Sequence, residues 1–239
     1  GCDTSQFIIC CQNHDQVGNR PNGNRLSTLV PDAALNVAAA SMLLAPNIPL
    51  IFMGEEYGET APFLYFVDHA DPHIQASVRD GRQAEYKYFG WSETGHNPNT
   101  INAFEHSRVH PGIQSHSRKK ATLHWYRRLI ELRKNTPALG ASHGSMVRLW
   151  TFNERVLIMH RWGTEGPQAM VVLGFNSTPT EIAICAPLGT WTRMLDSASE
   201  KGSATGQATM PDTLTITVDA QPTSIPSFTA TVYLTNQIL

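Results

Sequence analysis

The sequence has no apolar run of the roughly 18 residues that a membrane-spanning helix needs, and no secretion signal is expected at its start. Cysteine is scarce: the chain has 4 cysteines, without the Cys-x-x-Cys spacing of zinc and redox sites. The formal net charge is only −2, which makes nucleic acid and anionic membranes poor partners. These absences favour a cytoplasmic protein in a reducing compartment, with neither a metal nor a cofactor.

The composition is that of a globular protein. Hydrophobic residues make up 41% of the 239 residues and charged residues 16%, so a core of ordinary size can form. The length suits one large domain or two ordinary ones. The chain begins with Gly1 and enters a strand almost at once, so we expect it to be part of a longer protein.

The first part of the chain has the order strand, helix, strand. Residues 6–12 and 49–53 are apolar runs typical of parallel strands buried on both faces, and residues 32–45 are rich in helix formers. The first run ends in the polar residues 12–15, and the second ends in carboxylates and glycine. Ligands bind at the carboxyl ends of strands in parallel α/β folds, so we expect a functional site there.

The rest of the chain divides near residue 142. Residues 57–117 form a long irregular region, often a functional one, with a helix expected from Pro72 to about Tyr86. An amphipathic helix follows and stops at Pro137. Short β-rich runs then alternate with turns, which predicts an antiparallel sandwich able to fold alone.

Alternation of apolar and polar residues is clearest near the end of the chain. In residues 213–218 we expect Leu214, Ile216 and Val218 to share one face, and residues 228–234 show the same period of two. Phe228, Ala230, Val232 and Leu234 are expected to share one face in the second case, and such alternation with turns between is typical of an antiparallel sandwich.

Two stretches carry a family resemblance. "QNHDQVGNR" at residues 12–20 and "FMGEEYGETAPFLYF" at 52–66 resemble the α-amylase superfamily of glycoside hydrolases, in which an Asn-His-Asp triplet closes the seventh barrel strand. The resemblance implies that residues 1–141 are the last part of a (β/α)8 TIM barrel, with strands 7 and 8 and helices. Residues 142–239 would be the C-terminal antiparallel β-sandwich domain. A whole barrel takes roughly 250 residues, so only its last quarter fits here.

The resemblance also implies roles for single residues. Asp15 matches the carboxylate that stabilises the oxocarbenium-like transition state, whereas the nucleophile and general acid lie on strands four and five, which have no counterpart here. We therefore expect no activity from this chain alone. The candidates for substrate binding follow the two strand ends: His14, Asn13, Gln16, Arg20, Glu56, Phe63 and Tyr65.

Structural roles compete with these assignments. Asp15 and His14 can be read as a turn or helix-cap cluster, and Gln16 and Arg20 can hold the loop instead of a sugar. Phe63 and Tyr65 are as well suited to a core as to a sugar platform. Arg25 is expected to be a structural ion-pair partner.

The resemblance is closest to those members that release trehalose. The whole enzyme would cleave the α-1,4 bond next to the terminal trehalose of maltooligosyl trehalose, with retention of configuration, and its partner would be this malto-oligosaccharide. Two alternatives remain open: an α-1,4-glucan branching enzyme, and a non-catalytic glucan-binding or structural module. The sequence does not determine the oligomeric state.

Overall fold

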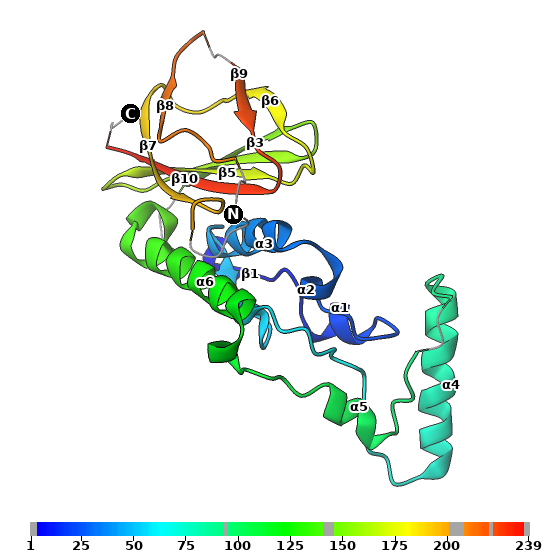
Figure 1. Ribbon diagram of the computed structural model, residues 1–239. Coiled ribbons are helices and arrows are strands. Elements are labelled where there is room, and N and C mark those ends of the chain that lie inside the picture. Colours follow the sequence, from blue (N-terminus) through cyan, green and yellow to red (C-terminus); the bar gives the residue numbers. More distant parts are fainter. Residues whose placement is uncertain (1–3, 93–94, 141–145, 201–207, 220–221, 237–239) are drawn as a thin grey trace.

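The computed structural model describes residues 4–92, 95–140, 146–200, 208–219 and 222–236. A helical half and a β half stack on each other, with α4 standing apart at one side of the helical half (Figure 1). The predicted boundary near residue 142 lies outside the described residues. The helices, with η for 3-10 turns, are η1 (Thr4–Gln6), α1 (His14–Gly18), α2 (Leu26–Leu29), α3 (Asp32–Leu43), η2 (Glu55–Tyr57), α4 (Pro72–Tyr88), α5 (Ile101–His106), η3 (Ile113–Ser115), α6 (Ser117–Asn135) and η4 (Pro137–Leu139).

The strands form one parallel pair and two antiparallel sheets. The parallel pair is β1–β2, and the antiparallel sheets have the orders β3-β4-β5-β10-β7-β8 and β6-β9. The strand bounds are β1 (Ile8–Ile9), β2 (Ile48–Pro49), β3 (Met146–Phe152), β4 (Val156–Trp162), β5 (Gln168–Gly174), β6 (Thr180–Ala183), β7 (Gly189–Asp196), β8 (Thr213–Ile216), β9 (Pro222–Ile225) and β10 (Thr229–Thr235). The antiparallel β half agrees with the expectation, although β9 was not foreseen because its sequence is short and begins with proline.

The strand-helix-strand order at the start is confirmed, but both strands are shorter than predicted. Ile8 pairs with Ile48, and α3 lies between the two strands in the chain. Each strand has only the other as a neighbour among the described residues, and these residues form no closed barrel. Ile8 is 65% exposed although its sequence is that of a buried strand. The pair therefore leaves apolar side chains uncovered.

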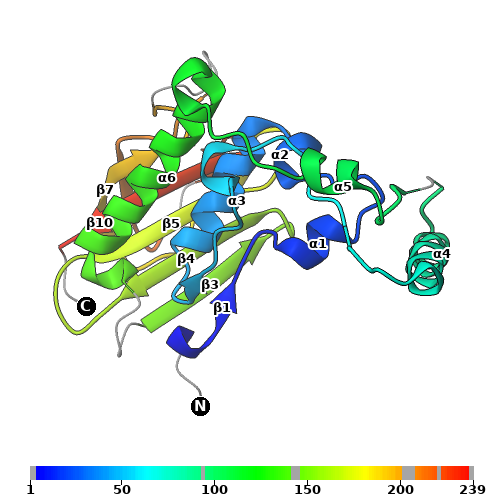
Figure 2. The same ribbon diagram turned by 90° about the horizontal axis from the view of Figure 1, so that it is seen from below.

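The six-stranded sheet is covered on both faces. Helices α3 and α6 lie across one face (Figure 2), where Val232 of β10 joins a core with Leu43 and Leu129. The small β6-β9 sheet covers the other face, where Tyr233 packs in a second core. Phe228, Ala230, Val232 and Leu234 all belong to the first of these cores, so the predicted period of two is confirmed. The alternate face of β10 is buried as well, because β10 is a central strand between two layers. Val218, which follows β8, is exposed and does not join Leu214 and Ile216 in the second core.

A buried arginine joins the two halves. The Arg161 side chain on β4 donates hydrogen bonds to the carbonyl oxygens of Leu44 at 2.9 Å, Leu139 at 2.7 Å and Gly140 at 2.6 Å. Arg161 is fully buried, and burial lowers its pKa to about 10. Because the halves share a core and these contacts, the structure argues against independent folding of residues 145–239.

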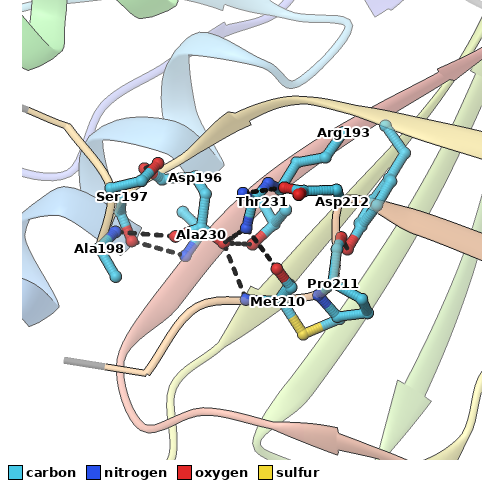
Figure 3. A network of polar contacts seen from close by, with 11 residues as sticks. Arg193, Asp196, Ser197, Ala198, Met210, Pro211, Asp212, Ala230 and Thr231 are labelled. Carbon is cyan, nitrogen blue, oxygen red and sulfur yellow. Dashed lines mark hydrogen bonds and ion pairs between the residues drawn. The ribbon is translucent and has the colours of Figure 1, made fainter.

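A buried carboxylate organises the end of β7 (Figure 3). Asp196 accepts hydrogen bonds from the backbone N–H groups of Ala198 at 2.9 Å and Met210 at 3.1 Å, and from the hydroxyl of Thr231 at 2.9 Å. The Nη1 atom of Arg193 lies 3.8 Å from Oδ2 of Asp196. The network connects β7, β10 and the segment before β8, so the charge is well satisfied inside the fold.

Candidate functional site

The polar cluster after β1 forms a capped helix turn. The Oδ1 atom of Asn13 accepts hydrogen bonds from the backbone N–H groups of Asp15 at 2.8 Å and Gln16 at 3.2 Å. In return the Gln16 side-chain oxygen accepts from the backbone N–H of Asn13 at 2.7 Å. This reciprocal arrangement is a capping box. The side-chain oxygens of Asn13 and Gln16 are thus used to build the turn.

The capping box leaves His14 and Asp15 pointing outward. Their side chains are 70% and 71% exposed, and Nε2 of His14 lies 3.4 Å from Oδ1 of Asp15. Neither side chain is needed for the cap, since Asn13 fills that role. An imidazole and a carboxylate side by side on an open surface can donate and accept hydrogen bonds to a polar ligand.

A buried hydrogen-bond network lies next to this turn and involves Gln12 and Glu55. The side-chain oxygen of Gln12 accepts from the backbone N–H of Leu26 at 3.0 Å. Glu55 accepts from the backbone N–H of Phe52 at 3.1 Å and from the hydroxyl of Tyr126 at 2.8 Å. Burial raises the pKa of Glu55 above its ordinary value. Glu55 therefore has a structural role, while Glu56 beside it is only half-buried.

An aromatic row lies next to the end of β2. Phe63 packs edge-on against Phe52 and Phe66, with ring centroids 5.4 and 6.3 Å apart. The row borders a hollow of about 390 Å³ that Met53 also lines. Gly23 is required beside it, because its φ is +56° and an added Cβ would lie 2.6 Å from the Phe63 carbonyl oxygen. The backbone of Phe63 therefore packs directly against Gly23, and its N–H donates to the Gly23 carbonyl oxygen at 2.9 Å.

Arg25 has different partners from those expected. Its guanidinium donates to the carbonyl oxygens of Ala61 at 2.6 Å and Met53 at 2.7 Å, and it lies 4.9 Å from the centre of the Phe52 ring. The predicted structural role holds, but the described residues form no salt bridge with Arg25. Backbone carbonyl oxygens accept from Nε and Nη1 of this buried cation, while its Nη2 has no hydrogen-bond partner among the described residues.

Arg82 has a role that was not predicted from the sequence. From α4, its guanidinium donates to the side-chain oxygen of Asn19 at 2.9 Å and to the carbonyl oxygen of Gly18 at 3.0 Å. It also lies 4.6 Å from the centre of the Tyr65 ring. Arg82 thus connects α4 to the end of α1 and to one predicted substrate-binding residue. A lone arginine in a solvated helix carries no sequence signal for this role.

Groups that could bind a metal are not found in the described part of the chain. No cluster of three or more His, Cys, Asp or Glu side chains there could hold an ion. Asp71, which stands between two histidines, instead caps α4 by accepting the backbone N–H of His73 at 2.8 Å. No helix among the described residues is long and apolar enough to cross a bilayer.

Solved structures place the fold among α-amylase-family proteins. A Salmonella typhimurium protein described as an alpha amylase matches 98% of this chain with a TM-score of 0.74 and 28% identity, using 36% of its own length. The isomaltulose synthase SmuA from Protaminobacter rubrum matches 96% of this chain and 43% of its own, with a TM-score of 0.58 and 17% identity. The second similarity concerns the fold alone. No protein-family model matches the chain.

Curated relatives identify the particular protein that the chain resembles: malto-oligosyltrehalose trehalohydrolase. The Rhizobium sp. protein of that name is 38% identical over 134 residues, which is 56% of this chain. The Saccharolobus solfataricus protein is 42% identical over 132 residues, or 55% of the chain, and a Mycobacterium tuberculosis protein is 30% identical over 178 residues, or 73%. The chain spans only 22% to 30% of the length of these relatives. The resemblance seen in the sequence is confirmed.

Proposed function

We propose that this chain is the C-terminal part of a glycoside hydrolase that releases trehalose from maltooligosyl trehalose. The observation that carries the proposal is the outward-facing His14 and Asp15 pair on a capped turn after β1, in a chain 30% to 42% identical to trehalohydrolases. The names of these relatives do not favour a branching enzyme. The bond cleaved would be the α-1,4 bond next to the terminal trehalose.

In this proposal residues 1–141 complete a (β/α)8 barrel, and residues 142–239 are its C-terminal β-sandwich. Strands β1 and β2 would be the seventh and eighth barrel strands. Their parallel pairing and the exposed side chains of Phe7, Ile8 and Ile48 support this assignment, because barrel strands have neighbours on both sides. Additional strands would cover these apolar groups.

The Asp15 carboxylate would stabilise the positive charge that develops on the sugar ring in the transition state. His14 would hydrogen-bond the same sugar. Asn13 and Gln16 use their side-chain oxygens in the capping box, so their amide N–H groups are the parts available to a substrate. The remaining contacts in this proposal are Arg20, Glu56, Phe63 and Tyr65.

The nucleophile and the general acid would come from outside these 239 residues. A retaining glycosidase needs two carboxyl groups, one to attack the anomeric carbon and one to protonate the leaving oxygen. Asp15 can stabilise charge but cannot do both tasks. We therefore expect no trehalose release from the 239-residue chain by itself.

The test is a product assay with the full-length protein that carries this chain. Incubation with maltooligosyl trehalose should yield free trehalose, and the 239-residue chain assayed in parallel should yield none. New branch points in a linear glucan would favour the branching enzyme. Glucan binding without turnover would favour a non-catalytic module.

A further inference from the structure

Helix α4 contacts the segment that follows the candidate catalytic pair. Arg82 is bonded to Gly18 and Asn19, and its side chain is only 12% exposed. The backbone N–H of His96, beyond α4, donates to the carbonyl oxygen of Pro21 at 3.3 Å. The apparent gap between the α1 and α4 ribbons (Figure 1) is thus bridged by side chains.

The end of α4 turns a tryptophan toward this segment. Gly90 has φ of +79°, and its N–H donates to the carbonyl oxygen of Lys87 at 3.1 Å. The N–H of Trp91 donates to the carbonyl oxygen of Tyr86 at 2.9 Å. This pair of bonds is a Schellman motif, which reverses the chain after a helix. The indole of Trp91 consequently lies beside the loop after α1.

Arg20 packs on this indole. The guanidinium carbon of Arg20 lies 4.8 Å from the centre of the Trp91 ring, within the range of a cation–π contact. Its Nε atom is buried and has no hydrogen-bond partner among the described residues. Trp91 itself remains 37% exposed. The Trp91 ring and the unsatisfied Nε of Arg20 therefore lie together, and Arg20 follows Asp15 by five positions in the chain.

We propose that Trp91 and Arg20 form an outer subsite that binds glucose units of the malto-oligosyl chain away from the cleaved bond. This inference rests on the proposed function and names further residues of the same site. The indole offers a flat apolar surface for the C–H face of a sugar, and the guanidinium offers N–H donors for its hydroxyl groups. Arg82 is a positioning residue that fixes the subsite relative to Asp15.

The subsite predicts a dependence on chain length. A short substrate would occupy only the region around His14 and Asp15, whereas a longer one would also reach Trp91. If Trp91 only packed the end of α4, its substitution would affect folding, and binding would then change equally for short and long substrates. Binding and chain-length measurements therefore separate the two roles.

The direct experiment is a titration of the 239-residue chain with maltoheptaose, followed by tryptophan fluorescence and calorimetry. The emission change on binding should vanish in Trp91→Phe. Affinity should fall about tenfold in Trp91→Ala, change little in Trp91→Phe, and fall less in Arg20→Gln than in Trp91→Ala. Tyr88→Ala is the matched control, because Tyr88 is an exposed aromatic residue of the same helix end, and it should bind as the wild type does.

Two results would overturn the inference: no heat or emission change with wild-type chain up to the solubility limit of maltoheptaose, or equal affinity in Trp91→Ala and wild type. The melting temperature of each variant shows that it is folded. In the full-length enzyme, Trp91→Ala should raise KM for long substrates and leave kcat unchanged. An absence of trehalose release by the wild-type enzyme would refute the proposed function alone, since glucan binding through Trp91 is measured separately.

Discussion

The hydroxyl of Tyr126 on α6 donates a 2.8 Å hydrogen bond to Oε1 of Glu55 after β2, inside the core. The two residues lie 71 positions apart in the chain. Burial raises the pKa of Glu55, and it also raises that of Tyr126, so the tyrosine remains a donor. The contact joins the strand end that carries the candidate site to the helix that covers the sheet.

Glu55 should make stability depend on pH. Because its folded pKa lies above the ordinary value of 4.5, the folded state retains a proton that the unfolded chain releases. Its contribution to the free energy of unfolding is fully present below pH 4.5 and is lost as pH rises through the folded pKa. Urea unfolding from pH 4 to 7 should therefore show wild type losing stability relative to Glu55→Gln.

A second variant sharpens this measurement. Tyr126→Phe removes the donor and should lower the free energy of unfolding by about 1–3 kcal/mol at neutral pH. Parallel pH slopes in wild type and Glu55→Gln would contradict the assignment of the buried proton to Glu55.

Asp15→Asn should separate a transition-state role from a turn-forming role. Asparagine keeps the shape of the side chain but removes its charge, so kcat for trehalose release by the full-length enzyme should fall about 10²–10³-fold. KM should change much less, because the charge acts mainly in the transition state. The Asp15 side chain takes no part in the capping box, so the melting temperature should stay near that of wild type. A kcat within about threefold of wild type would remove Asp15 from the mechanism.

Arg161→Met tests the junction between the halves. The substitution leaves the carbonyl oxygens of Leu44, Leu139 and Gly140 without their donor. We expect the free energy of unfolding to fall by about 2–4 kcal/mol. Arg155→Met, at an exposed position of the same hairpin, should change it by less than about 0.5 kcal/mol. Equal stability of the two variants would show that the buried arginine does not hold the halves together.

Asp196→Asn tests the network of Figure 3. An amide NH2 group in place of one carboxylate oxygen must face the donor at Ala198 or the donors at Met210 and Thr231, so at least one donor loses its acceptor. The melting temperature should fall, corresponding to a loss of about 1–3 kcal/mol in the free energy of unfolding. Thr231→Val removes one bond of the network and should cost less. A larger loss in Thr231→Val than in Asp196→Asn would contradict the central place of the carboxylate.

Much of the local structure was predictable from the sequence. Helices α3, α4 and α6 and most strands of the β half lie where propensity and apolar periodicity place them, because those signals act over a few neighbouring residues. The position of His14 and Asp15 directly after a strand was also visible. Strand lengths at β1 and β2 were overestimated, since pairing requires a neighbour that an apolar run does not specify.

The tertiary structure alone decided which polar groups meet. Arg25, Arg82 and Arg161 find carbonyl oxygens 36, 64 and 117 positions away, and any residue type can supply a carbonyl. The residue types in the sequence therefore do not predict which carbonyl such an arginine will contact. Likewise, β10 has the period of an ordinary strand, but only the layers packed on either side bury both of its faces. The sequence by itself determined the elements and the place of the candidate pair, while the packing of distant backbone determined their partners.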